Sequence, residues 1–250
     1  MKKTTIFLLH VLLSLSFFAC SDDPNGEDSN TKKGDLLIEF RATYNTQPLF
    51  MNIGKYTNAF KDTLIVNTFN YYISNLVLES TNGQEYALPK DESYFLIRND
   101  EQESRSLNLK NIPEADYTAL RFTIGVDSLK SVADISEREG ALDIVDNSDM
   151  YWEWNAGYIF FKIEGSSPQA PEKNGQKLFR YHIGGFGGLN TPTANNLREA
   201  RVPFINLSNT QLTANVRQGG KAPFIILGPN IYKLFSVQHD VSIRDYHTVM

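Results

Sequence analysis

The sequence predicts an all-β fold, an antiparallel β-sandwich with one short helical insertion. The first observation is that apolar and polar residues alternate along many short segments, as they do in strands with one buried face. The second is that Pro, Gly and Asn separate these segments at short intervals. The third is that only residues 128–140 carry a helical pattern. We therefore expect residues 36–250 to form one β-rich domain, with abundant Phe and Tyr for its core.

The strands are expected in the following order. In segment 36–44, Leu36, Ile38 and Phe40 fall on one face of a half-buried strand. Segment 67–80 is rich in aromatic and β-branched residues, which favour strands. Further short strands are predicted at 93–98, 105–109, 120–126, 157–163, 177–183, 200–207, 211–217 and 223–228.

One turn and one helix complete the predicted elements. The dipeptide Asn82-Gly83 is typical of a tight hairpin turn and predicts a strand at 85–88. In the helical segment 128–140, Ser131 is a possible N-cap and Gly140 a stop signal.

The amino terminus predicts export. Two lysines precede an apolar run that is too short to span a bilayer, so residues 1–19 are interpreted as a lipoprotein signal peptide. The run ends at Cys20, the only cysteine, which we expect to become the acylated first residue. The alternative is a cysteine that stands by chance beside an ordinary cleavage site. Residues 20–35 lack large apolar side chains until the domain begins and are predicted to be a flexible tether.

Charge and cysteine content restrict the partners. Cleavage before Cys20 removes two lysines and lowers the formal charge by two, from −5 to −7. A negative chain is a poor partner for nucleic acid, so we expect none. We expect a monomer without disulfides, lipid-anchored to the outer membrane and lying in the cell envelope, on its periplasmic or its exposed side.

Both tryptophans lie in one stretch, DMYWEWNAGYIFFKIEG, residues 149–165. On a strand, Met150, Trp152 and Trp154 would project to the same side, about 6.5–7 Å apart at each step. One interpretation is a core face, which is the usual place for such residues. The other is a functional surface, because Asn155-Ala156-Gly157 interrupts the strand pattern directly afterwards.

A family resemblance adds to this interpretation. The segments NYYISNLVL, FTIGVDSL and GALD, the tryptophan stretch and RYHIGG resemble, in this order, the landmarks of the MbnP-like copper-binding proteins. The resemblance runs from Leu36 almost to the carboxyl end. It implies a β-rich, extracytoplasmic copper-binding protein. It also implies, as in some members, that a partner di-haem enzyme of the peroxidase type oxidises Trp152 or Trp154 to kynurenine.

The residues agree with copper chemistry. Copper(I) favours sulfur and imidazole nitrogen, and Met150 and His182 supply one of each. An indole face can also lie against the ion as a cation–π partner. His182 matches the family's histidine in RYHIGG. We therefore expect His182 to lie close to Met150 and to Trp152 or Trp154, in a partly exposed copper(I) site.

Family members of the methanobactin-associated type carry several cysteines, and this chain lacks them. A second imidazole would have to come from His239 or His247, and we take His239 as the additional candidate. The alternative function is a binding module without metal, in which the two indoles form an aromatic platform for a glycan or a protein. No nucleophile or metalloprotease motif is present in the sequence, so we do not expect an enzyme.

Three aspartates at 143, 146 and 149 precede the tryptophans. They lack the spacing and the glycine of a calcium loop, so we interpret them as turn and cap carboxylates.

Overall fold

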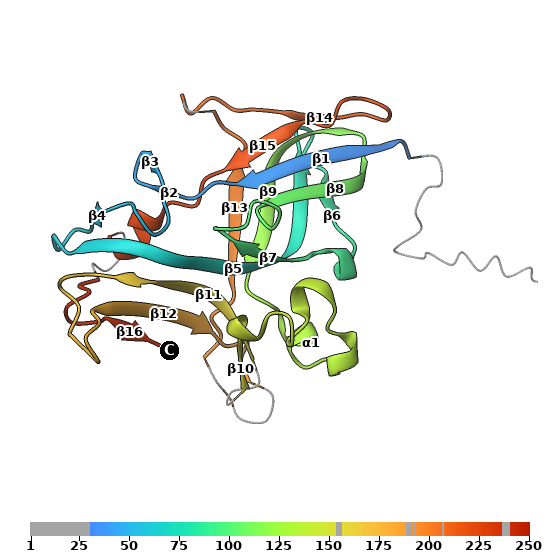
Figure 1. The fold of residues 1–250 in the computed structure, drawn as a ribbon. Helices are drawn as coiled ribbons and strands as arrows, with labels where there is room; N and C mark the ends of the chain where they lie inside the picture. The colour runs from blue at the N-terminus through green and yellow to red at the C-terminus, as the bar shows by residue number, and fades with distance from the viewer. Residues whose placement is uncertain (1–30, 154–156, 189–191, 193, 207, 237–240) are drawn as a thin grey trace, which may run out of the picture. The chain divides into compact units, whose positions relative to one another are not determined.

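The structure is a computed structural model that describes residues 31–153, 157–188, 192, 194–206, 208–236 and 241–250. Residues 32–250 form one compact unit. This unit consists mainly of strands, which confirms the predicted all-β class (Figure 1). Within the described residues, every helix is too short or too polar to cross a membrane.

A small sheet and a large sheet carry the fold. The small sheet places β1 (Lys33–Phe40) between β15 (Phe224–Leu227) and β8 (Ser106–Pro113). The path of the large sheet is β13 (Arg198–Pro203), β9 (Ala115–Ile124), β5 (Thr63–Ser80), β11 (Gly157–Ser166), β12 (Leu178–Gly184) and β16 (Thr248–Val249). Attached to that path are β4 (Tyr56–Thr57), β6 (Glu85–Ala87), β7 (Tyr94–Arg98), β10 (Tyr151–Trp152) and β14 (Ala214–Val216). A separate hairpin joins β2 (Thr43–Tyr44) to β3 (Gln47–Pro48).

The pairing is mostly but not entirely antiparallel. β1 pairs with β15 in parallel, and β12 pairs with β16 in parallel. The first strand begins at Lys33, three residues before the expected start at Leu36, because Lys33 and Gly34 already pair with the end of β8. The paired strands β2, β3, β4 and β16 contain only two residues each. Strands of this length are too short to show a period-two pattern in the sequence.

The expected helix at 128–140 is shorter than predicted. Its α-helical part, α1, covers only Ser128–Ser131, and short 3₁₀ turns follow. Asp127 is the N-cap, accepting from the Lys130 N–H, whereas the expected cap Ser131 is the buried last residue. Asp134 then accepts from the backbone N–H and the hydroxyl of Ser136, and this local bonding competes with helix continuation. The 3₁₀ turns within the described residues include η1 (Lys90–Glu92), η2 (Ile135–Glu137), η3 (Gly140–Leu142), η4 (Ser148–Met150) and η6 (Ile231–Phe235).

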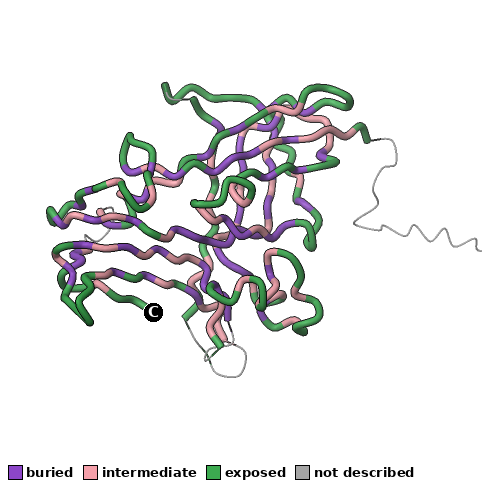
Figure 2. The backbone as a smooth tube through the Cα atoms, viewed as in Figure 1, coloured by how far each residue is buried: buried purple, intermediate pink, exposed green. Residues whose placement is uncertain are grey.

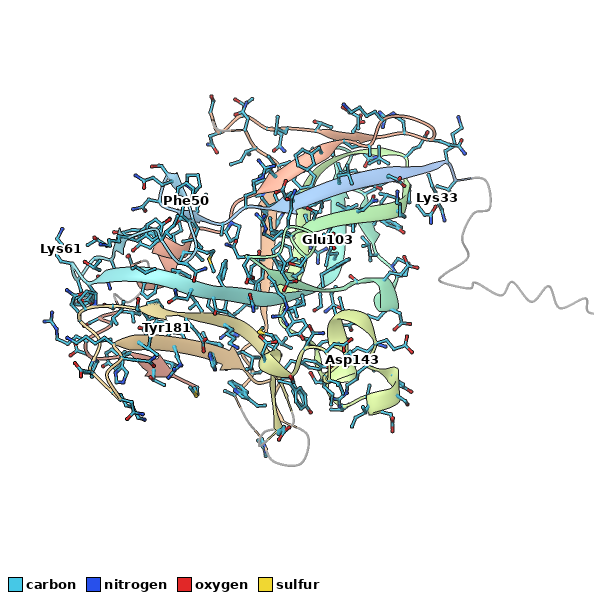
Figure 3. All side chains as sticks on the ribbon, viewed as in Figure 1. Lys33, Phe50, Lys61, Glu103, Asp143 and Tyr181 are labelled. Atoms are coloured by element: carbon cyan, nitrogen blue, oxygen red, sulfur yellow. The ribbon has the colours of Figure 1, made fainter. Side chains whose placement is uncertain are left out.

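The main core lies between the two sheets, where side chains fill the space between β1 and β5 (Figure 3). Phe40 of β1 meets Tyr71 of β5 and Phe122 of β9 edge to face, with ring centroids 6.2 and 6.1 Å apart. Buried and less buried residues alternate along most strands, as the period-two pattern predicts (Figure 2).

A second, smaller core covers the opposite face of the large sheet. Adjacent residues of β5 separate the two cores, because Tyr71 faces the main core and Tyr72 the second. The segment from α1 to β10 supplies the cover, including Leu142 and Met150. This second core is where the residues of the tryptophan stretch come to lie.

Candidate metal centre

The described residues of the tryptophan stretch form two paired strands and a preceding turn, not one regular strand. β10 contains only Tyr151 and Trp152, which pair with Tyr158 and Gly157 of β11. Met150 belongs to the preceding 3₁₀ turn, η4, in which the Met150 N–H donates to the Asn147 carbonyl at 2.9 Å. The Tyr151 N–H closes the end of this turn on the Ser148 carbonyl. The expectation that Met150 and Trp152 project to the same side of one strand is therefore wrong, because Met150 precedes β10.

Met150 is completely buried. It lies in the second core, in the same cluster as Tyr72, Tyr158 and Phe160. The apolar surroundings explain this position without a metal, since burying such a side chain stabilises the fold by about 1.5–3 kcal/mol. A completely buried Met150 does not fit the partly exposed site that the sequence predicts.

Trp152 packs on the strand that carries His182. A Cβ atom added to Gly184 would lie 2.6 Å from Trp152 Cζ3 and 3.2 Å from Cη2, so the six-membered ring covers this glycine. His182 and Gly184 are two residues apart on β12, and residues at this spacing share a face, about 6.5–7 Å apart. Trp152 is itself half-buried. The structure thus brings the indole and the imidazole to one face of β12.

His182 is held by a carboxylate. Its Nε2 lies 2.8 Å from Glu164 Oε1 on the neighbouring strand β11. The hydrogen bond with His182 lowers the pKa of Glu164, and the charges of Lys162 and Arg180 act in the same direction against burial. The imidazole side chain is 11% exposed, so it is largely covered.

Two cations hold the Met150 turn on the sheet through Asp149. Lys162, the cross-strand neighbour of His182, donates from Nζ to the Asp149 carbonyl at 2.9 Å. Arg98 binds both oxygens of the Asp149 carboxylate, at 2.7 and 3.1 Å, and this contact lowers the pKa of Asp149. Lys162 therefore places a positive charge beside the Met150 turn, which disfavours a second cation at that position.

The other predicted site residues are placed as follows. Cys20, Trp154 and His239 lie outside the described residues. His247 comes to β12 through its backbone, whose carbonyl accepts from the Arg180 N–H at 2.7 Å. The described residues contain no group of three His, Cys, Asp or Glu side chains arranged to hold a metal ion.

The aspartates before the tryptophans act in turns and ion pairs. Asp143 accepts from the N–H groups of Val145 and Asp146, at 2.7 and 3.1 Å, which confirms the predicted turn role for this residue. Asp149 instead pairs with Arg98 and Lys162.

Sequence reasoning missed the site roles of Glu164 and Lys162. A signal was present, because both alternate with Phe161 and Ile163 and so occupy the polar face of β11. Their link to His182 depends on the pairing of β11 with β12, in which Lys162 lies opposite His182 and Glu164 opposite Arg180.

Comparisons with known proteins agree with this fold. The sequence profile of the MbnP family matches residues 33–250. The structure of MbnP from Methylosinus trichosporium is similar, with a TM-score of 0.50 and 15% sequence identity, over 68% of this chain and 72% of that one. At this identity the similarity concerns the fold. No curated protein matches the chain in sequence.

Proposed function

Because the chain belongs to the MbnP family, we propose that it binds copper in the cell envelope and is not an enzyme. The observation that carries the proposal is the common face of β12, where Trp152 covers Gly184 two residues from His182. Copper(I) favours imidazole nitrogen, and an indole face attracts a cation. His182 and Trp152 are therefore the described residues that fit such an ion.

His182 would bind the metal through Nδ1, since Nε2 is engaged by Glu164 at 2.8 Å. A carboxylate on the second ring nitrogen is the usual partner of a metal-binding histidine, because it fixes the ring and raises its basicity. Glu164 is thus a positioning residue for His182. Trp154 and His239 remain candidate ligands by sequence alone.

Met150 has no part in this proposal as a ligand. Its complete burial and the Lys162 ammonium beside the Met150 turn both support that exclusion. The oxidation of Trp152 or Trp154 to kynurenine by a partner di-haem enzyme stays part of the proposal. Mass spectrometry of the tryptic peptide that contains both residues in protein isolated from its native host tests it.

Copper(I) competition titration tests the binding proposal. We expect His182→Ala to weaken copper(I) binding at least about tenfold, or roughly 1.4 kcal/mol, relative to the wild type. Met150→Leu should leave the affinity within about twofold, because the thioether lies in the core. His247→Ala is the matched control, since this histidine meets β12 through its backbone.

The outcomes separate the possible functions. Equal affinities for the wild type and His182→Ala would contradict the site. A loss of copper(I) affinity in Met150→Leu but not in His182→Ala would show that the Met150 sulfur is a ligand. An absence of copper binding in the wild type would favour the aromatic platform for a glycan or a protein.

The membrane attachment is tested separately. We propose that residues 1–19 direct export and that Cys20 is acylated, which anchors the protein to the outer membrane. Radiolabelled palmitate should label the wild type and not Cys20→Ala, and the variant should leave the membrane fraction. Equal labelling of both proteins would contradict the lipoprotein proposal.

A further inference from the structure

Three polar side chains from separate segments meet at the start of α1. Asn75 belongs to β5, Lys90 begins η1, and Asp127 is the N-cap of α1. Lys90 Nζ donates to Asn75 Oδ1 and, at 2.6 Å, to Asp127 Oδ2. Asn75 Nδ2 donates to the same oxygen of Asp127 at 3.1 Å. An amine, an amide and a carboxylate are therefore in mutual contact.

The backbone holds Asn75 in this position. The pairing of β5 with β9 shifts its register between Ser74 and Val77, and Asn75 has a left-handed φ of 55°. The Asn75 N–H donates to the Ser93 carbonyl at 3.0 Å, just after η1. Irregularities of this kind in a ladder re-aim a side chain. Here the Asn75 amide is directed to Lys90 and Asp127.

The carboxylate is the more buried of the two charged groups. The Asp127 side chain is 17% exposed, whereas the Lys90 side chain is 46% exposed. The Tyr94 hydroxyl also donates to Asp127 Oδ2, at 2.9 Å. Burial raises the pKa of Asp127, but its hydrogen-bond donors hold the pKa below the usual value, so the carboxylate is ionised and can accept a proton. Since Lys90 is nearly half exposed, the cluster has a route to solvent.

We propose that Lys90 and Asn75 form an intramolecular isopeptide bond, and that Asp127 transfers the protons. The new bond joins Lys90 Nζ to Asn75 Cγ, and the bond from Cγ to Nδ2 breaks. Lys90 loses two protons, which Asp127 passes to the leaving nitrogen, so ammonium departs and the carboxylate is restored. The step needs no oxidant and no cofactor. One oxygen of Asp127 contacts both the attacking and the leaving nitrogen, which places it within reach of both proton transfers.

The bond gives the domain a covalent cross-link that cysteines do not supply. Cys20 is the only cysteine in the sequence, so residues 32–250 contain none. The link joins positions 15 residues apart and closes the loop that carries β6. Such a cross-link stabilises a fold by restricting the unfolded chain. None of the three residues belongs to the candidate metal centre, so the proposal does not depend on copper binding.

Tryptic digestion of the denatured protein, followed by mass spectrometry, tests the bond. Without the bond, cleavage after Lys61 and Lys90 releases residues 62–90 at full mass. With the bond, trypsin does not cleave after the acylated Lys90, so the peptide extends to Arg98 and is lighter by one ammonia. Its tandem spectra should lack backbone fragments between residues 75 and 90, because this part is a ring. Lys110, which binds Asp35 at 2.6 Å, is the internal control and should be cleaved.

Two variants identify the reacting groups. Lys90→Arg keeps the positive charge but has no primary amine, so we expect cleavage after position 90 and a peptide of full mass. Asp127→Asn removes the proton acceptor and should leave Asn75 and Lys90 unlinked, with circular dichroism as the check that the variant folds. A link that still forms in Asp127→Asn would refute the role of this carboxylate.

The wild-type digest decides the proposal by itself. Cleavage after Lys90 with a peptide of full mass would show that the contact is an ordinary ion pair and that the proposal is wrong. Loss of ammonia from a peptide that is still cleaved after Lys90 would place a succinimide at Asn82-Gly83, and this result would also contradict the isopeptide bond.

Discussion

Glu164 Oε1 lies 2.8 Å from His182 Nε2 across the β11–β12 pair. The two residues are diagonal neighbours, because Glu164 is opposite Arg180 and His182 opposite Lys162. The hydrogen bond with His182 lowers the pKa of Glu164, and the charges of Lys162 and Arg180 lower it further, against the effect of burial. This arrangement fixes the imidazole before any ligand is present.

The Glu164 carboxylate should make stability depend on pH. Since its pKa is lower in the folded state, its contribution is present above the unfolded pKa and is lost as pH falls through the folded value. Glu164→Gln should therefore lower the free energy of unfolding by about 1 kcal/mol at pH 7. It should also flatten the decline between roughly pH 5 and pH 3. Urea unfolding at several pH values measures both effects, and parallel curves for the two proteins would contradict the assignment.

Periodicity predicted the sheets better than the site. The long β5 strand was expected because its aromatic and β-branched residues extend over many positions. Its burial alternates toward both ends, but residues 69–74 are all buried, because the two cores lie on opposite faces of this part of the strand. The neighbours of β5 were not predictable, since period two says which face is buried and not which strand lies beside it. The contact between Glu164 and His182 depends on the same kind of information, the pairing of β11 with β12.

The tryptophan stretch shows a second limit of the sequence. The apolar residue types at Met150 and Trp152 fit a strand, but a 3₁₀ turn ends at Met150. Two distant cations, Arg98 and Lys162, bind Asp149 and hold this turn on the sheet. Such tertiary contacts override the local sequence pattern, and the pattern alone does not predict them.

Arg98 should anchor that turn. It is 16% exposed and binds both carboxylate oxygens of Asp149. Arg98→Met keeps the apolar stem and removes the charge-assisted bonds, so we expect a loss of about 1.5–3 kcal/mol in unfolding free energy. Arg201→Met, at a 56% exposed arginine paired with Glu79, is the matched control and should cost less than about 1 kcal/mol. Equal losses of unfolding free energy in the two variants would show that the Arg98–Asp149 contact stabilises the fold no more than an exposed ion pair does.

Asp127 should stabilise the start of α1. It caps the helix and also accepts from Lys90, Tyr94 and Asn75. Burial raises the pKa of Asp127, but these donors hold it below its usual value. Asp127→Ala should lower the unfolding free energy by about 1–2 kcal/mol, measured by urea denaturation. Asp134→Ala, which removes the cap of the exposed turn η2, should cost less, and the reverse order would refute the ranking.

Gly184 should be required for the position of the Trp152 ring. An added Cβ would lie 2.6 Å from Trp152 Cζ3 and 2.5 Å from the Tyr158 carbonyl oxygen, so something must move. We expect Gly184→Ala to cost about 1–3 kcal/mol of unfolding free energy. Gly228→Ala is the control, because its Cβ would be 3.4 Å from the nearest atom, an ordinary contact.

A double-mutant cycle assigns this cost to the indole or to the backbone. If the ring is the main obstacle, Gly184→Ala should cost less in a Trp152→Ala background, and the two substitutions should couple by at least about 0.5 kcal/mol. In a Trp154→Phe background, the emission of Trp152 alone should shift to the red when Gly184→Ala displaces the ring toward solvent. Additive energies with an unshifted spectrum would mean that the Tyr158 carbonyl causes the clash. Copper(I) affinity measured on the same variants then tells whether His182 needs the indole on its own face of β12.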